Sequence, residues 1–277
     1  MLKTKYKRGL VKMADYYGTT SKEKLEDVDV QISMKNLFPG TQLHSSTDES
    51  LHSYGRTLVI DLNKSEEDIF SEIRKNARYK INRAAKRDNV QFCAIFSPTN
   101  QQIDEFVEFF NQFAKNKNIP KCIKGKLQGL RDKDALTITY VKDEDEKTLC
   151  YHAYLRTKEY CSMIHSASAR FDNSQIRSLI GRANRYLHWE DIKMFKEKGH
   201  KWYDFCGLFV DPSTDDELNL NRFKKEFGGI EIDVDKKIYA HSLIGKAVVF
   251  LFKWKMRNRP EYNRAKLIKH HNYSLGK

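Results

Sequence analysis

Residues 181–209 read GRANRYLHWEDIKMFKEKGHKWYDFCGLF, and residues 221–229 follow with NRFKKEFGG. The first stretch begins inside a long helical pattern, residues 174–198, in which a break is expected near Asn184. The apolar and aromatic run KWYDFCGL, residues 201–208, then predicts a strand, and NRFKKEFGG predicts another helix. Together they give the order helix, strand, helix on which the fold assignment depends.

The sequence on both sides extends this order. Residues 135–170 alternate in three runs separated by charged turns, which predicts three antiparallel strands. Before them, residues 90–96 predict a strand and residues 97–119 a helix with an apolar face. After them, residues 230–240 predict a last strand. The order indicates an α+β or mixed-sheet domain over residues 90–240.

The preceding segment contains a strand at residues 57–62 and a helix expected from Glu66 to about Lys86, with Asn63 or Ser65 as its cap. The apolar positions of this helix recur every three or four residues and define one buried face: Ile69, Ile73, Ala77, Ile81 and Ala84. Residues 19–55 are rich in polar residues and predict a loop-rich region with one short strand.

The quoted stretches resemble the FemABX family of peptidoglycan-bridge aminoacyltransferases and their relatives in surface-polysaccharide clusters. In that family a Leu-x-Trp helix precedes a Tyr-Asp-Phe-x-Gly strand and a Phe-Lys-x-x-Phe-Gly helix. The three pieces occur here in that order, as Leu187 and Trp189, then Tyr203, Asp204, Phe205 and Gly207, then Phe223, Lys224, Phe227 and Gly228. The resemblance covers residues 58–240 and implies a GNAT-like α+β fold, with a mixed, mostly antiparallel sheet flanked by helices.

The resemblance also predicts the domain organisation. Bridge-forming members of the family have two GNAT-like domains, and the part before residue 95 is too short for a complete first copy. We therefore expect an incomplete, truncated N-terminal GNAT-like region at residues 1–95, which includes the basic helix at 66–87. A GNAT-like transferase domain would follow at residues 96–240, and a basic amphipathic tail at residues 241–277.

Lys224 is the leading catalytic candidate. In the family the matching lysine contacts the aminoacyl-tRNA end near the ester carbonyl, where a fixed cation favours the negative charge that develops on oxygen. A solvated surface lysine is the alternative, because Lys225 is adjacent.

Asp204 and two histidines are the other catalytic candidates. An unperturbed carboxylate is a weak base near neutral pH, so pairing of Asp204 with Arg182 or Arg185 is favoured over general-base catalysis. His165, or His152, lies on a predicted central strand and would accept the proton of the attacking amine. For each histidine the alternative is a hydrogen-bonded position in the core.

The donor site is expected at RSLIGRA, residues 177–183. Gly181 and Ala183 match the end of the motif with which CoA-dependent GNAT enzymes bind pyrophosphate at a helix N-terminus, but Ser178 occupies its first position. This departure favours an acyl group carried on tRNA, as in FemABX proteins. The predicted donor-binding residues are Arg177, Gly181, Arg182, Ala183, Arg185 and Phe223.

The acceptor site is expected on the basic helix. Residues 74–87 carry seven positive charges and no acid, so these cations lack the intrahelical partners of an ordinary exposed helix. A solvated face is the alternative. The predicted acceptor- or phosphate-binding residues are Arg74, Arg78, Lys80 and Arg83.

The net charge of +13 is concentrated at the two ends of the chain. Residues 1–12 carry five positive charges and no acid, residues 241–277 carry nine against Glu261, and the body between them is neutral. We interpret the ends as basic arms for a charged surface. The second arm also contains the apolar run AVVFLF and Trp254, which would contact a membrane or pack on the sheet as a last helix.

These features predict an acyl- or aminoacyltransferase that forms an amide on a cell-envelope precursor, with aminoacyl-tRNA as the donor and a nucleotide- or lipid-linked glycan as the acceptor. Acyl-CoA or an acyl carrier acylating an amino sugar is the alternative, and a nucleic-acid-binding module is an alternative of another class. No tightly bound cofactor is expected. Five cysteines without C-x-x-C spacing argue against a metal site and a disulfide framework. We expect a cytoplasmic protein, peripheral at the inner face of the plasma membrane, because no secretory signal or spanning segment is recognisable.

Overall fold

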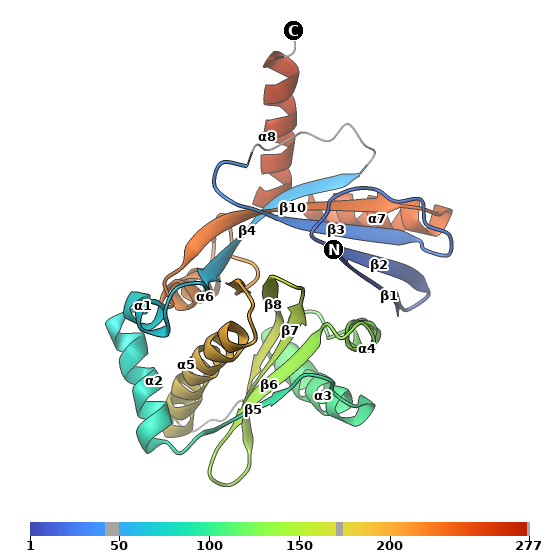
Figure 1. The fold of residues 1–277 in the computed structure, drawn as a ribbon. Coiled ribbons are helices and arrows are strands. Elements are labelled where there is room, and N and C mark those ends of the chain that lie inside the picture. Colours follow the sequence, from blue (N-terminus) through green and yellow to red (C-terminus); the bar gives the residue numbers. More distant parts are fainter. Residues whose placement is uncertain (42–49, 170–173, 276–277) are drawn as a thin grey trace. The chain divides into compact units, whose positions relative to one another are not determined.

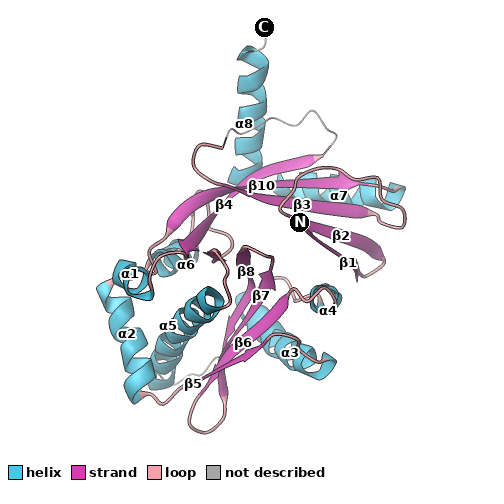
Figure 2. Cartoon of the chain, viewed as in Figure 1, coloured by secondary structure: helices cyan, strands magenta, loops and turns pink. Residues whose placement is uncertain are grey.

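The computed structural model describes residues 1–41, 50–169 and 174–275, and its helices and strands are drawn in Figure 2. The chain forms two compact units. The first unit comprises Met1–Leu58, Gly207–Asn221 and Glu231–Lys277, and the second comprises Val59–Cys206 and Arg222–Ile230. The division predicted at residues 95 and 240 stays a prediction, since these units follow packing and not sequence resemblance.

The second unit contains the predicted transferase elements. In chain order after β4 (Leu51–Asp61) these are α1 (Glu66–Glu72), α2 (Lys75–Arg87), β5 (Gln91–Ile95), α3 (Asn100–Lys117), α4 (Lys124–Arg131), β6 (Leu136–Lys142), β7 (Thr148–Arg156), β8 (Tyr160–Ser168), α5 (Ser174–Glu197) and β9 (Trp202–Asp204). The strand order is β4-β9-β8-β7-β6-β5, antiparallel except for the parallel pair β8 and β9. Figure 1 shows α5 and α2 on one side of β6 and β7, and α3 and α4 on the other. The expected mixed, mostly antiparallel sheet with flanking helices is confirmed.

The predicted helix over residues 66–86 is two helices. Its five apolar positions are all buried, as expected. However, Ile73 has an extended backbone that ends α1, and the amide of Arg74 donates to the carbonyl of Glu226 at 2.8 Å. Because this hydrogen bond goes to Glu226 and not to a residue of α1, the helical hydrogen-bond pattern is interrupted at Arg74. A second helix, α2, then begins at Lys75. Ser65 caps α1 by accepting a hydrogen bond from the amide of Asp68.

The long helix α5 is continuous, so the expected break near Asn184 is wrong. The Asn184 side chain lies within 3.0 Å of His152 Nε2 on β7. An asparagine destabilises a helix chiefly when its side chain competes for backbone hydrogen bonds, and this one is engaged elsewhere.

The first unit is built from three separate parts of the chain. Its strands are β1 (Leu2–Arg8), β2 (Val11–Tyr17), β3 (Val30–Leu37), β4 (Leu51–Asp61) and β10 (Ile230–Ala240), in the order β1-β2-β3-β10-β4, with α6 (Asp215–Lys225), α7 (Leu243–Met256) and α8 (Pro260–Leu275) as helices. β1 and β2 pair antiparallel, as do β3 and β10, whereas β2 and β3 are parallel. Both α6 and β10 also contribute residues to the second unit.

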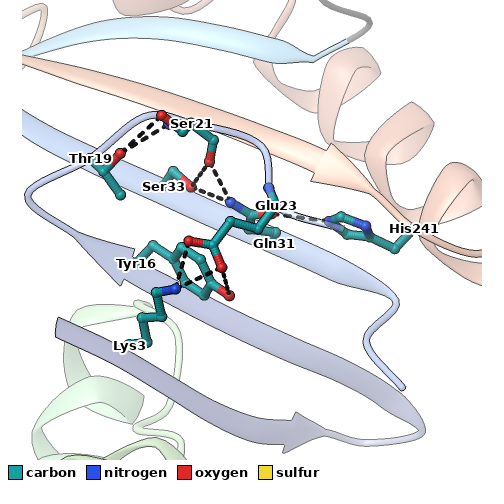
Figure 3. A network of polar contacts seen from close by, with 8 residues as sticks. All are labelled: Lys3, Tyr16, Thr19, Ser21, Glu23, Gln31, Ser33 and His241. Atoms are coloured by element: carbon teal, nitrogen blue, oxygen red, sulfur yellow. Dashed lines mark hydrogen bonds and ion pairs between the residues drawn. The ribbon is translucent and has the colours of Figure 1, made fainter. Parts of the chain in front are cut away.

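The expectation of one short strand in residues 19–55 is wrong, because β3 and the first five residues of β4 lie there. The polar content of β3 concealed it: Gln31 and Ser33 are fully buried in the middle of the strand. Figure 3 shows how they are satisfied. The Gln31 amide donates to the Ser21 carbonyl at 2.8 Å and to Ser33 Oγ at 2.7 Å, and its oxygen accepts from the Glu23 amide at 3.2 Å. The loop after β2 thus supplies hydrogen-bond partners to the buried Gln31 side chain. A water-exposed side chain would obtain such partners from solvent.

The basic N-terminal segment is a β-hairpin in this sheet. Its lysines have acidic partners, since Lys3 pairs with Glu23 at 2.6 Å and Lys12 pairs with Asp27. The Glu23 carboxylate also accepts from Tyr16 at 3.1 Å, so part of the hairpin's charge is used within the protein (Figure 3).

The C-terminal helix α7 packs on this sheet. Ser242 caps it, accepting from the Gly245 amide at 3.0 Å and donating to Asp29. Val249 joins the cluster formed by Met13, Val30 and Ile238. Gly245 is required because a Cβ there would collide with the Asp29 carbonyl. The residues that the sequence interpretation assigned to a separate tail therefore complete the first unit.

Candidate active site

The candidate site lies where the parallel pair β8 and β9 separates. The two strands pair over three positions, the last being Ser162 with Asp204, and β8 then continues to Ser168 paired only with β7. Ligands of sheets with parallel strands are commonly bound beyond the carboxyl ends of those strands. The motif residues that follow Asp204 therefore stand at a favourable position.

Asp204 organises the turn after β9. Its Oδ1 accepts from the Cys206 amide at 2.8 Å, and its Oδ2 accepts from Ser162 Oγ at 3.3 Å. Cys206 and Gly207 have positive φ angles of 48° and 60°, an uncommon conformation for cysteine. The carboxylate thus holds a backbone turn, and the two arginines expected to pair with it have other acidic partners: Arg182 pairs with Asp88 and Arg185 with Glu226.

That turn presents a carbonyl to Lys224. Lys224 lies in the last turn of α6 and is only 6% exposed, and its Nζ donates to the Cys206 carbonyl oxygen. The neighbouring Lys225 is exposed. Of the two adjacent lysines, it is therefore Lys224 whose ammonium is fixed next to Asp204 and Cys206.

The burial of Lys224 lowers the pKa of its ammonium, and nearby groups work in the opposite direction. A charged Cys206 would raise that pKa, but burial itself raises the pKa of the Cys206 thiol well above its usual range, so the thiol is neutral near pH 7. Asp204 is then the group that favours the charged lysine.

Gly228 closes this part of the motif. Its φ is 76°, and a Cβ at this position would lie 2.9 Å from the Cβ of Glu72. The chain must turn sharply after Phe227 to pass this close to α1, and only glycine combines the left-handed backbone with that contact. The Phe-Gly ending of the motif is thus explained by the geometry at the end of α6.

Phe223 and Arg185 form a second group beside Lys224. The Arg185 guanidinium lies 4.8 Å from the centre of the Phe223 ring. The same guanidinium donates to Glu226 at 2.7 and 2.9 Å and to the Gly181 carbonyl at 2.9 Å. Arg185 therefore serves to connect α5 with the end of α6, and its charge is already paired.

The other predicted donor residues lie along α5. Arg182 forms a two-point ion pair with Asp88, at 2.5 and 2.9 Å. Gly181 and Ala183 lie inside the helix, which begins at Ser174, and Ala183 is fully buried in the cluster with Ala84. Arg177 is exposed near the start of α5. Their role in donor binding stays a prediction.

A buried chain of polar groups lies beneath Phe223. Tyr154 OH donates to Asp191 Oδ2 at 2.6 Å, Tyr203 OH lies 2.7 Å from Tyr154 OH, and His188 Nδ1 lies 2.7 Å from Tyr203 OH. Because each hydroxyl has one proton, these bonds run in one direction, with His188 Nδ1–H donating to Tyr203 and Tyr203 to Tyr154. His152 Nδ1 joins at Asp191 Oδ2, at 2.8 Å.

The direction of this chain places a proton on His188 Nδ1, and burial keeps the ring neutral. Burial, followed by the charges of His152, Lys224 and Arg185, holds its pKa well below the usual range. The ring packs 4.9 Å from Phe205 and 5.5 Å from Phe223, measured between ring centres. The polar chain thus positions the His188 ring against Phe205 and Phe223, next to Lys224.

Three members of this chain are also spaced so that they could share a metal ion. Among the described residues, His152, His188 and Asp191 have ligand atoms within 4.8 Å of one another. Each is already hydrogen-bonded to other protein groups. Of the side-chain atoms of these three residues, only Asp191 Oδ1 is buried without a hydrogen-bond partner. We describe the cluster as a hydrogen-bonded network, and the expectation that the protein holds no metal stays a prediction.

His165 has different neighbours from His152. His165 Nε2 lies 3.5 Å from Cys122 Sγ, and the centre of its ring lies 4.5 Å from that of Phe110 of α3, with the two ring planes tilted. Burial, assisted by Lys126, lowers the His165 pKa to about 4. His165 is therefore a neutral side chain packed on α3, and its contacts do not include Lys224 or Asp204.

The predicted acceptor residues lie on α2, whose buried face packs on α5 (Figure 1). Arg74 and Arg83 are exposed, and Arg78 and Lys80 are half-buried. Arg83 lies 3.9 Å from Asp88, the acid just beyond the run. These residues form a basic surface within the second unit.

A cavity of about 350 Å³ lies in the first unit, where the segment after β9 meets the junction of α7 and α8. Its lining carries both signs of charge, from Asp211, Glu217, Lys255 and Arg259. None of the predicted site residues lines it.

The structure therefore brings together Lys224, Asp204, Phe223 and Arg185, but not His165 or Arg182. Sequence reasoning missed the Cys206 carbonyl and the chain from Asp191 to His188. One signal was present: Asn184, His188 and Asp191 are spaced by four and three residues, which places three polar groups on one face of a helix.

No protein-family model and no curated protein sequence matches this chain. Among solved structures it is similar to FemX, with a TM-score of 0.59 and 11% identity over 89% of this chain and 85% of that one. It is also similar to the C-terminal domain of a putative lysylphosphatidylglycerol synthetase from Agrobacterium fabrum, with a TM-score of 0.54 and 12% identity over 91% and 84% of the two chains. At such identities the similarity establishes the fold alone. The protein has the FemX-like, GNAT-type fold that the motifs predicted.

Proposed function

We propose that the protein is an aminoacyltransferase that forms an amide between the carboxyl group of an aminoacyl-tRNA and an amine on a cell-envelope precursor. One observation carries the proposal: Lys224, at the motif position expected for it, is a buried cation fixed between the Cys206 carbonyl and Asp204 at the end of β9. The FemX-like fold supports the same class of reaction at the level of architecture.

In this reaction the amine attacks the ester carbonyl, negative charge develops on the carbonyl oxygen, and the ribose oxygen leaves as a hydroxyl that takes up the proton lost by the amine. Lys224 would stabilise that developing charge. A positioned donor of this kind is typically worth roughly 3 to 4 kcal/mol of transition-state stabilisation. Asp204 would act indirectly, by holding the turn whose carbonyl positions Lys224.

The basic surface of α2 and the exposed Arg177 are the proposed contacts for phosphates. Arg74, Arg78, Lys80 and Arg83 would bind a nucleotide- or lipid-linked glycan acceptor, and Arg177 would lie near the donor. Phosphate groups are suitable partners for arginines without competing acids on the same helix.

The alternative of an acyl-CoA or acyl-carrier donor is less supported. A CoA pyrophosphate is usually bound by free amides at a helix N-terminus, whereas Gly181 and Ala183 lie in the interior of α5. A nucleic-acid-binding module is less supported as well, because the 36 basic and 36 acidic residues between 13 and 240 balance.

Within the described part of the chain, no helix combines the length and apolar character required to cross a bilayer. We propose that the enzyme works in the cytoplasm and touches the inner face of the plasma membrane peripherally.

The test is a transfer assay with the purified full chain. Radiolabelled aminoacyl-tRNAs are offered with nucleotide-linked and lipid-linked muropeptides or amino sugars, and the same acceptors are offered with labelled acyl-CoA. We expect label to enter an acceptor from tRNA and the reaction to stop after ribonuclease treatment. Transfer from acyl-CoA that survives ribonuclease would replace the proposal by its alternative.

A further inference from the structure

Helix α7 exposes large apolar side chains on the side that does not pack on the sheet. Leu243 is 83% exposed, Phe250 69%, Leu251 60% and Trp254 61%. An α-helix advances about 100° per residue, so these four side chains fall within an arc of about 100°, with Ala247 inside it and Ile244 next to it. They form one continuous stripe, which we call the outer stripe of α7.

The outer stripe is not the face with which α7 packs on the sheet, because α7 has a separate buried face. Val248, Val249, Phe252 and Met256 pack against the first unit's sheet, as part of the cluster around Met13 and Ile238. Figure 1 shows α7 lying along β3. A helix that is apolar on two opposite sides requires an apolar environment on both.

Basic residues border the outer stripe. On the helical wheel, Lys246 and Lys253 lie on one edge and Lys255 on the other, and Arg257 follows immediately after the helix, with its guanidinium 5.2 Å from the centre of the Trp254 ring. The sequence of α7 contains no acidic residue. An aromatic and aliphatic stripe with cations on both edges is the pattern of a helix that lies in the plane of an anionic lipid surface.

We propose that the outer stripe of α7 inserts into a bilayer that carries anionic headgroups, with the lysines contacting phosphates. Charge decides against a second copy of this chain as the occupant, since pairing the two stripes would set basic rows against basic rows. The whole face is contained in the first unit and includes none of the proposed catalytic residues. The inference therefore goes beyond the proposed chemistry and does not depend on it.

The test measures binding of the full chain to vesicles of phosphatidylcholine, with and without phosphatidylglycerol, by sedimentation and by Trp254 fluorescence with brominated lipid as quencher. Phe250→Glu and Trp254→Glu remove apolar area at exposed positions. Ile119→Glu places the same charge at an exposed apolar residue of the second unit and serves as the matched control.

We expect binding to require phosphatidylglycerol, to weaken about tenfold or more for each glutamate in the stripe, and to weaken about fivefold for Lys255→Ala. The Ile119→Glu variant should bind as wild type does. Sedimentation equilibrium is measured in parallel. Failure of the wild type to bind vesicles, equal binding by the stripe variants, or a dimer that those variants dissociate would each overturn the inference. Aminoacyl transfer to a soluble acceptor that persists in the stripe variants would separate this result from the proposed function.

Discussion

Replacing Lys224 by methionine tests the centre of the proposed site. Methionine keeps a similar length and removes only the charge and its hydrogen bond to the Cys206 carbonyl. If the ammonium stabilises the developing oxyanion, its loss costs roughly 3 to 4 kcal/mol in the transition state, which is about a hundredfold to a thousandfold in the rate of transfer.

The effect on stability should be much smaller. The lost hydrogen bond costs about 1 to 3 kcal/mol, but an apolar side chain also avoids the desolvation that lowers the Lys224 pKa. These terms oppose each other, so the melting temperature should change by only a few degrees.

The assay is single-turnover transfer of a labelled amino acid, measured with the thermal unfolding of the same samples. Lys225→Met is the matched control, because Lys225 is adjacent and exposed, and it should transfer at the wild-type rate. A folded Lys224→Met variant that transfers as fast as wild type would refute the role of this cation. If Lys224→Met unfolds, Lys224→Arg retains the charge, and full loss of transfer in a folded Lys224→Arg variant would point to a requirement for lysine geometry.

Three further predictions concern the remaining features. Because burial lowers the His165 pKa from 6.5 to about 4, the unfolded chain binds this proton more tightly, so stability is fully present above about pH 6.5 and falls by roughly 3 kcal/mol as the pH approaches 4; chemical denaturation of His165→Phe should lack this loss. Arg78→Glu with Arg83→Glu should abolish acceptor binding in equilibrium titrations and leave the circular dichroism spectrum unchanged, whereas unaltered affinity would exclude α2 from the acceptor site. Gly245→Ala should lower the free energy of unfolding by about 2 kcal/mol or more, because its Cβ meets the Asp29 carbonyl, while Gly55→Ala, at a position with open space and no positive φ angle, provides a comparison in the same unit.

The sequence was sufficient for the elements whose apolar pattern is regular. The strands β6, β7 and β8 and the helix α3 follow directly from alternation and helical spacing. It was insufficient for β3, because the burial of Gln31 depends on hydrogen bonds from a loop eight to ten residues earlier in the chain. The break at Ile73 likewise depends on a partner, Glu226, that is remote in sequence.

The candidate site divides in the same way. The motif identified Lys224, Asp204 and Phe223, and the structure gives each a specific contact. Pairing of charges was not predictable from composition: Arg182 and Arg185 find Asp88 and Glu226, one before and one after them in the chain. The apolar C-terminal segment had two open interpretations, packing on the sheet or contact with a membrane. In the structure α7 has one apolar face that is buried on the sheet and another that is exposed.

The position of β10 has a consequence for biosynthesis. In the first unit this strand lies between β3 and β4, which are made about 170 to 190 residues earlier. While the ribosome is still translating the intervening chain, both of those strands lack a neighbour and offer open edges to other nascent polypeptides. A product that stops short of Ile230 would keep these edges permanently, so premature termination should yield aggregates instead of a smaller active protein.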